Sequence, residues 1–365
     1  MKISEIINHL ETQAPFSFQE SYDNSGLITG NHTMEVTGIL IALDCLESIV
    51  DEAIANNCNL IIAHHPIVFS GLKKINGKNY IERVIIKAIK NDIAILAIHT
   101  NLDNVFHGVN HKIAEKIGLK NLKILAPKKE ILRKFVTYCP ADAAEKVRQA
   151  LWNAGAGKIG NYTEVSFNSN GTGTYKGNEF SNPVIGEKGK LEREPEERIE
   201  VIYAAHLERN ILSALRASHP YEEIAYDLIA LENERPDVGS GMVGELESEI
   251  KLEEFLKLLK TKMKTDVIRF TQIPGKKVKK VAICGGSGSF LLQNAINSGA
   301  DVFVTADFKY HQFFDGEGKI VIADIGHFES EQFTIDLLYD NLKQKFPTFA
   351  ILKTGISTNP ITYFT

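Results

Sequence analysis

Two adjacent histidines, His64 and His65, end an apolar run in the segment NLIIAHHPIVF, and a proline follows them at once. Neighbouring side chains on a β-strand point to opposite faces, so one bound ion is not expected to contact both imidazoles unless the strand has already ended before them. Two divalent cations about 3.5–4 Å apart, bridged by a carboxylate, would accept one imidazole each. We therefore interpret the pair as part of a two-metal site, with each histidine on a different ion.

Two further pairs place a carboxylate four residues after a histidine. If a helix begins just after Gly326, His327 and Glu331 share one of its faces, and His99 and Asp103 repeat the spacing. Imidazole and oxygen ligands without cysteine fit Zn, Mn or Fe(II) better than a closed structural zinc site. The predicted metal ligands are His64, His65, Asp103, His327 and Glu331.

His99 is open to three roles: a metal ligand, a donor that orients Asp103, or a general acid or base. We favour the second and third roles, and we name Glu331 and His99 as the candidate catalytic residues. The alternative interpretation is a helix-start glutamate favoured by the helix dipole, a satisfied histidine, and a loop pair with one packed ring. That alternative is the better one for any single histidine, whereas three such pairs at strand ends favour metal binding. His107 and His111 are expected at the surface.

Two other segments offer groups that suit a phosphate. The Gly-rich turn CGGSGSF, 284–290, lies between a predicted strand and a predicted helix, where backbone N–H groups can hold a phosphate. It matches neither the dinucleotide-binding nor the P-loop motif, and a tight turn with Ser289 as the helix N-cap explains it equally well. Lys73, Lys74 and Lys78, in the loop after the histidine pair, fit either a polyphosphate contact or full solvation.

The chemistry-bearing residues follow the carboxyl ends of predicted parallel strands, where open α/β sheets bind ligands. Asp307, Lys309 and His311 form a further group at such an end. The first half reads as strands 36–44, 60–63 and 93–98 with helices 46–57 and 80–90. The second half reads as strands 279–286, 301–307 and 319–327 with helices 289–299 and 329–346. The halves align with a one-residue slip, so we expect two similar α/β halves with mostly parallel sheets forming one core domain.

The segment between the halves has the βαββαβ pattern of a ferredoxin-like α+β domain. Its predicted elements are strands 132–140, 198–205 and 223–232, helices 141–155 and 208–218, and a polar stretch at 161–178 with a hairpin-like Gly/Asn centre. The charged stretch 186–198 is expected to be a solvated loop. We predict an inserted domain at 130–233 within a discontinuous core domain of residues 1–129 and 234–365.

Composition indicates an ordinary globular protein of 365 residues, with 44% hydrophobic and 24% charged residues and a net charge of −5. No Lys/Arg block dominates any region, which argues against a nucleic-acid partner. No apolar run reaches the length of a membrane span, and the N-terminus lacks the features of a signal peptide. The four distant cysteines, without a CxxC pair, predict reduced core thiols. We expect a cytoplasmic protein that binds neither membranes nor nucleic acids.

Six motifs in both halves carry a family resemblance. They are DNSGL (23–27), AHHP (63–66), HTNLDN (99–104), CGGSG (284–288), TADFKYH (305–311) and GHFESE (326–331). Together they resemble the GTP cyclohydrolase I type 2 family, also known as dinuclear-metal Ngg-interacting-factor-like proteins. In that family the positions that match the five predicted ligands bind two metal ions. The family usually has Gly within its TGD motif where this chain has Ala306, a change that leaves Asp307 in place.

The resemblance also implies a function and an assembly. The insert resembles a PII-like or cation-tolerance-like domain, most clearly in SHPYEEIAYD, 218–227. The resemblance implies a toroidal homohexamer, built as a trimer of dimers. It also implies two divalent metal ions per chain, with zinc expected ahead of iron or manganese. The implied reaction opens the imidazole ring of GTP and yields formate and 7,8-dihydroneopterin triphosphate. Two alternatives are a two-metal phosphoesterase or amidohydrolase acting on another metabolite, and a non-enzymatic metal-binding regulatory protein.

Overall fold

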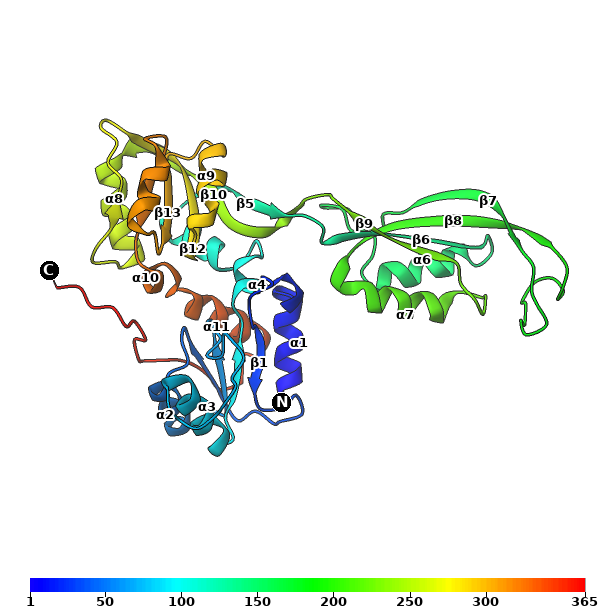
Figure 1. Ribbon diagram of the computed structural model, residues 1–365, viewed down its shortest axis with the longest axis horizontal. Helices are drawn as coiled ribbons and strands as arrows, with labels where there is room; N and C mark the ends of the chain where they lie inside the picture. The colour runs from blue at the N-terminus through cyan, green and yellow to red at the C-terminus, as the bar shows by residue number, and fades with distance from the viewer. Residues whose placement is uncertain (365) are drawn as a thin grey trace. The chain divides into compact units, whose positions relative to one another are not determined.

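The computed structural model describes residues 1–364 and divides the chain into two compact units (Figure 1). The core unit consists of Met1–Pro127 and Pro236–Thr365, and the insert consists of Lys128–Arg235. No helix within residues 1–364 combines the length and apolar character needed to cross a membrane. All four cysteines are buried and free of disulfides, as the sequence predicted.

The first half of the core unit contains a five-stranded sheet with the strand order β1-β4-β3-β2-β15. Its strands are β1 (Gly26–Thr29), β2 (Ile39–Ala42), β3 (Leu60–Ala63), β4 (Ala94–Ala97) and β15 (Ile351–Lys353). The three central strands are parallel, and every residue in them is buried, which explains their apolar sequences. Helices α2 (Glu47–Ala55) and α3 (Tyr80–Lys90) pack together against one face of this sheet.

The second half of the core unit contains a six-stranded sheet with the order β11-β14-β13-β12-β10-β5. Its strands are β5 (Lys120–Lys128), β10 (Arg235–Lys251), β11 (Arg269–Phe270), β12 (Lys277–Ser287), β13 (Val302–Ala306) and β14 (Val321–Asp324). Besides α2 and α3, the described part of the core unit contains the helices α1 (Ile3–Gln13), α4 (Thr100–Asp103), α5 (Val109–Ile117), α8 (Leu252–Met263), α9 (Leu292–Asn297), α10 (His327–Glu331) and α11 (Thr334–Lys345). Short 3₁₀ helices are η1 (Phe16–Phe18), η3 (Ser289–Leu291) and η4 (Tyr310–Gly316).

The two sheets repeat one arrangement, so the predicted pair of similar α/β halves is confirmed. In each sheet an antiparallel edge strand is followed by three parallel strands, β1-β4-β3-β2 in the first and β11-β14-β13-β12 in the second. A helix precedes the edge strand in both halves, α1 in the first and α8 in the second. The carboxyl ends of equivalent strands therefore carry equivalent loops, and these loops hold the candidate functional residues.

The insert has the element order βαββαβ and an antiparallel sheet with the order β7-β8-β6-β9. Its elements are β6 (Leu132–Pro140), α6 (Ala144–Asn153), β7 (Phe167–Tyr175), β8 (Glu192–Ala204), η2 (Ala205–Leu207), α7 (Glu208–Ser218) and β9 (Tyr226–Leu231). Both helices pack on one face of the sheet around buried Phe135, Val201 and Leu215.

Two predictions for the insert are wrong. The polar stretch with the Gly/Asn centre contains no hairpin, because β7 runs through it as one edge strand and pairs in continuous register with β8. The charged stretch is a loop only at its start, since Glu192–Arg198 forms the first half of β8. Both strands are largely exposed there, so backbone pairing decides the conformation and polar side chains are tolerated on either face.

Gly108, between α4 and α5, allows a close backbone approach that no side chain would permit. A Cβ at this position would lie 1.7 Å from the carbonyl oxygen of Leu102. We expect Gly108→Ala to lower the free energy of unfolding by roughly 1–3 kcal/mol or more, since the backbone must move to relieve the overlap. Urea unfolding would measure this against Gly71→Ala, whose added methyl group meets open space. Equal stability of the two variants would contradict this account of the α4–α5 connection.

Candidate metal centre

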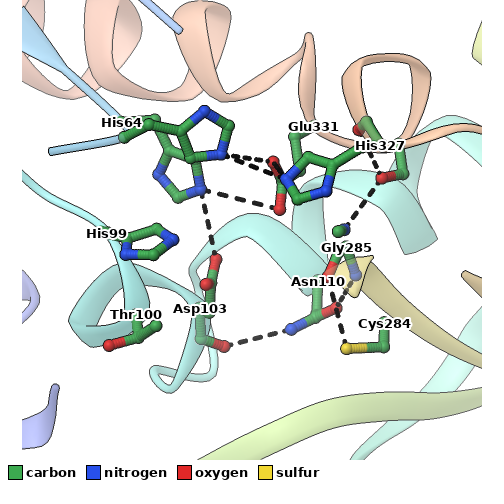
Figure 2. Close-up of polar contacts among 12 residues, drawn as sticks. His64, His99, Thr100, Asp103, Asn110, Cys284, Gly285, His327 and Glu331 are labelled. Carbon is green, nitrogen blue, oxygen red and sulfur yellow. Dashed lines mark hydrogen bonds and ion pairs between the residues drawn. The ribbon is translucent and has the colours of Figure 1, made fainter. Parts of the chain in front are cut away.

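Loops from both halves of the core unit surround one cavity of about 490 Å³ (Figure 2). The first half contributes His65, His99 and Asp103 to its lining, from the loops after β3 and β4. The second half contributes His327 and Glu331, both from α10. A cavity of this size suits a small-molecule ligand, and its chemistry needs both halves of the core unit.

Hydrogen bonds to the end of β2 and the residue after it fix the histidine pair just beyond the end of β3. The backbone N–H of His64 donates to the Ala42 carbonyl at 3.2 Å, and that of His65 donates to the Leu43 carbonyl at 2.9 Å. The backbone bends at both histidines and two successive N–H groups point to the same side, so the strand alternation considered in the sequence analysis has already ended at Ala63. Their ring centroids lie 4.9 Å apart at an interplanar angle of 46°. The two imidazoles reach the same region, and their ligand nitrogens lie within 4.8 Å of each other and of one from His99.

Each of the four histidines at the site is fixed through its Nδ1 atom. The acceptor is the Ile98 carbonyl for His64, and the carboxylates of Asp44, Asp23 and Asp307 for His65, His99 and His327, at 2.7–2.8 Å. Donation from Nδ1 sets the tautomer and leaves Nε2 to face the cavity, the arrangement usual for metal-binding histidines. The Nε2 atoms of His65 and His327 lie 3.3 Å apart, although they come from different halves of the core unit.

Glu331 is the carboxylate shared by two groups of potential ligands. Its Oε2 lies 2.9 Å from Nε2 of His65 and 3.1 Å from Nε2 of His327, while its Oε1 lies 3.8 Å from Nε2 of His64. Ligand atoms lie within 4.8 Å of one another in three groups, which are His65, His327 and Glu331; His64, Asp103 and Glu331; and His64, His65 and His99. The two oxygens of one carboxylate thus face the two histidines of the AHHP motif separately.

Two buried atoms at the site lack a hydrogen-bond partner among the described residues. They are Nε2 of His64 and Oδ1 of Asp103, which lie 3.6 Å apart, beyond hydrogen-bonding distance. Buried polar atoms in native proteins are almost always satisfied, so two unpaired lone-pair atoms facing each other point to a shared ligand that accepts both lone pairs. The nitrogen and oxygen donors present here fit a divalent cation.

The electrostatics of the site follow from the burial of carboxylates among imidazoles. Burial lowers the pKa of His65, but its hydrogen bonds to Asp44 and Glu331 outweigh this and raise it to about 10. Burial likewise lowers the pKa of His327, while Glu331 and Asp307 raise it to about 11. Burial and the charge of Glu331 raise the pKa of Asp103 to about 7. Burial opposes ionisation of Glu331, yet the surrounding histidines hold its pKa well below the usual value.

The remaining predicted residues lie at or beyond the edge of the site. His99 donates from Nδ1 to Asp23, so this nitrogen does not orient Asp103 as one of the predicted roles required. Lys309 and His311 are exposed and absent from the cavity lining. His107 is exposed and His111 partly buried, and their rings pack 5.0 Å apart.

The Gly-rich segment 284–290, whose first four residues end β12, uses two of its backbone donors within the protein. The N–H of Gly285 donates to Oδ1 of Asn110, and the N–H of Gly286 donates to Oγ of Ser330, both at 2.9 Å. These two donors are therefore not offered to a phosphate, and the segment instead fixes α10 beside the cavity. Ser289 is not an N-cap, because Gly288 occupies that position.

Sequence reasoning missed the ring-orienting roles of Asp23 and Asp44. Asp44 ends the first predicted strand, and Asp23 begins the DNSGL motif. These two positions are the features of the sequence that could have identified both carboxylates as part of the site. Asp307 had been placed at a strand end without a role, and it accepts a hydrogen bond from Nδ1 of His327. Ala306 ends β13 as a buried residue, and Asp307 follows it with a left-handed φ of 59°.

The fold and site define a two-half α/β protein with a centre of histidines and carboxylates between its halves. The Duf34/NIF3 (NGG1p interacting factor 3) family matches residues 1–360, and the chain belongs to this family. A Halalkalibacterium halodurans protein named "GTP cyclohydrolase 1 type 2 homolog" is 39% identical over 363 residues, covering 98% of each chain. A Staphylococcus aureus protein of the same name is 35% identical and fully covered. The structure of a Bacillus cereus protein related to NIF3 is 39% identical, with a TM-score of 0.85 over 100% of this chain and 99% of that one.

The raised pKa values of His65 and His327 predict a pH-dependent stability for chelator-treated protein. Each imidazolium stabilises the fold fully below the unfolded pKa of 6.5, and this contribution is lost as pH rises through about 10 and about 11. We expect the free energy of unfolding to fall between pH 7 and pH 11, and to fall less in a His65→Gln/His327→Gln double variant. Urea unfolding across this range measures the difference, with exposed His107→Gln as the control. Parallel curves for the double variant and the control would show that these histidines do not carry the effect.

Proposed function

We propose that this protein is a dinuclear metal-dependent hydrolase whose centre lies between the two α/β halves. One observation carries the proposal: Glu331 presents Oε2 to His65 and His327, and Oε1 to His64. A carboxylate placed in this way would serve as a ligand for both ions of a two-metal centre. One ion would be held by His65, His327 and Glu331, and the other by His64, Asp103 and Glu331.

The donor chemistry favours zinc, with iron or manganese as alternatives. Imidazole nitrogens and carboxylate oxygens surround the site, and each cavity-facing ring is supported by an oxygen acceptor. Cys284 also lines the cavity, but among the residues that the structure describes its sulfur belongs to none of the groups of ligand atoms that lie within 4.8 Å of one another. Cys284 is therefore left out of the proposed set.

The proton-transfer role falls to His99. Two divalent ions, when bound, supply Lewis acidity and make a coordinated water acidic near neutral pH. Glu331 is committed to both ions in this arrangement, whereas His99 belongs to neither of the two ligand sets. Asp23 fixes the His99 ring at 2.8 Å and so presents its other nitrogen in one orientation, as a general acid or base requires.

The substrate proposal rests on the names of relatives. Proteins 35–39% identical to this chain are named "GTP cyclohydrolase 1 type 2 homolog". We therefore propose a hydrolysis that opens the imidazole ring of a guanine compound and releases formate, with 7,8-dihydroneopterin triphosphate as the product when GTP is the substrate. The two-ion centre is compatible with this class of reaction, and the identity of the substrate is tested separately from the metals.

Metal content tests the centre directly. Protein purified without chelator and equilibrated with zinc should contain about two ions per chain by inductively coupled plasma mass spectrometry, because two ligand sets are present. Glu331→Gln should bind fewer than one ion, since it removes the shared carboxylate. His64→Ala should retain about one ion, and exposed His107→Ala should retain both. Two ions in the Glu331→Gln variant would contradict the bridging arrangement.

Formate release tests the reaction. Metal-loaded protein incubated with GTP should release formate, and His99→Gln should slow release by roughly 10²–10⁴-fold while retaining its metal, because general acid–base catalysis is lost. His65→Ala, which removes a ligand, is the reference for background. If zinc-, manganese- and iron-loaded protein all release no more formate than His65→Ala, GTP ring opening is excluded and the metal assignment is judged by metal content alone.

A further inference from the structure

Three large aromatic side chains converge on the cavity and remain exposed. Tyr22 is 60% exposed, Phe69 is 48% exposed and Phe290 is 63% exposed, and all three line the cavity that holds the candidate metal centre. Single exposed aromatic residues are common on protein surfaces, but apolar rings gathered at a cavity with a few polar groups are typical of a small-molecule site.

The aromatic side chains of the first half form a wall that extends to the histidines. The rings of Tyr22 and Phe69 lie 6.2 Å apart at 40°, and the ring of Phe69 lies 6.2 Å from that of His99. Asn24 fixes the segment that carries Phe69, because its Nδ2 donates to the Val68 carbonyl at 2.6 Å. A flat ring bound against Phe69 would therefore lie beside the candidate proton-transfer residue.

The second half provides an aromatic side chain on another element. Phe290 lies in η3, at the end of the Gly-rich segment 284–290 that also contributes Cys284 and Gly285 to the lining. Its backbone belongs to the half that carries α10, whereas Phe69 follows β3 in the first half. A planar ligand in the cavity thus meets aromatic surface from both halves of the core unit.

The carboxylates of the cavity are not matched by lysine or arginine from the described part of the chain. Its lining contains four carboxylates, those of Glu20, Asp44, Asp103 and Glu331, and no lysine or arginine from residues 1–364. Lys73, Lys74 and Lys78, the residues considered for a polyphosphate, are exposed and absent from the lining.

Bound cations would not give the cavity a net positive charge. Two divalent ions bring four positive charges, while five carboxylates either face the ions or orient the rings around them; these are Asp23, Asp44, Asp103, Asp307 and Glu331. A polyphosphate chain would therefore enter a cavity without a cationic side chain and with no net positive charge around the proposed ions.

We propose, on the basis of the proposed function, that this site recognises its substrate through a planar heteroaromatic ring stacked on Phe69, Tyr22 and Phe290. Its substrate class is a nucleoside or a comparable ring compound carrying little phosphate, because the protein supplies stacking surfaces and no charge partner for a triphosphate. Base–aromatic stacking tolerates many rings, so these side chains select for planarity and leave the choice of ring to polar contacts deeper in the cavity.

Isothermal titration of the zinc-loaded full chain with guanosine and with the magnesium complex of GTP separates ring recognition from phosphate recognition. We expect guanosine to bind at least as tightly as GTP, with an affinity that changes little between low and high salt. Absence of guanosine binding would overturn the proposal. An affinity for GTP more than about tenfold higher, with the advantage shrinking at high salt, would also overturn it because charge would then dominate binding.

Leucine variants test the stacking surfaces without touching a proposed metal ligand. Phe69→Leu and Phe290→Leu should each weaken guanosine binding by at least about fivefold, the loss expected for one base–aromatic stack, with metal content unchanged. The matched control is Phe314→Leu, a change at an aromatic residue that is 64% exposed but absent from the cavity lining. Unchanged affinity in both cavity variants overturns ring recognition while the metal centre stands, whereas a wild-type protein that binds no metal overturns the proposed function itself.

Discussion

The pairing of the Glu331 carboxylate with the surrounding imidazoles is the interaction on which the arrangement of the core unit depends. It is only 3% exposed and lies between imidazoles that arrive from two different sheets. An ionised carboxylate buried in this way is costly unless it is paired, so the histidines and Glu331 require one another. Because His65 follows β3 and Glu331 ends α10, satisfying this charge fixes the loops of one half against the other. The same requirement explains why the imidazoles carry protons when no cation replaces them.

The internal repeat explains how two halves can share one centre. Both sheets place a histidine, and a carboxylate four residues later, after the third parallel strand: His99 and Asp103 after β4, His327 and Glu331 after β14. The two histidine–carboxylate pairs do not make the same contacts, however. Glu331 contacts histidines of both halves, whereas Oδ1 of Asp103 faces only the unsatisfied nitrogen of His64. The duplicated backbone thus provides equivalent positions, and the side chains at those positions give only the second half a carboxylate that contacts histidines of both halves.

Local patterns predicted the elements whose conformation is decided locally. β3, α3, β6 and α7 have the predicted bounds, because each is a continuous apolar or amphipathic run with a clear boundary. The structure also brings together the five residues selected from strand ends and helix spacing. What the sequence could not provide was register: Asp44 meets His65 only because the His65 N–H pairs with Leu43. Register likewise decides β7, where pairing with β8 overrides a turn-like composition. The Gly-rich segment is decided by helix packing, because side chains of α5 and α10, Asn110 and Ser330, accept its hydrogen bonds.

The carboxylates that organise the site also limit what it can bind. Asp23, Asp44 and Asp307 are needed behind the rings, because each sets a tautomer and an orientation. Their charges, however, lie close to the cavity and oppose an anionic substrate as strongly as they support a cation. A cavity built in this way gains affinity for a substrate most readily through surfaces that carry no charge, and Tyr22, Phe69 and Phe290 provide them. The relatives' name refers to a triphosphate, whereas the residues around this cavity are suited to the ring that such a molecule carries.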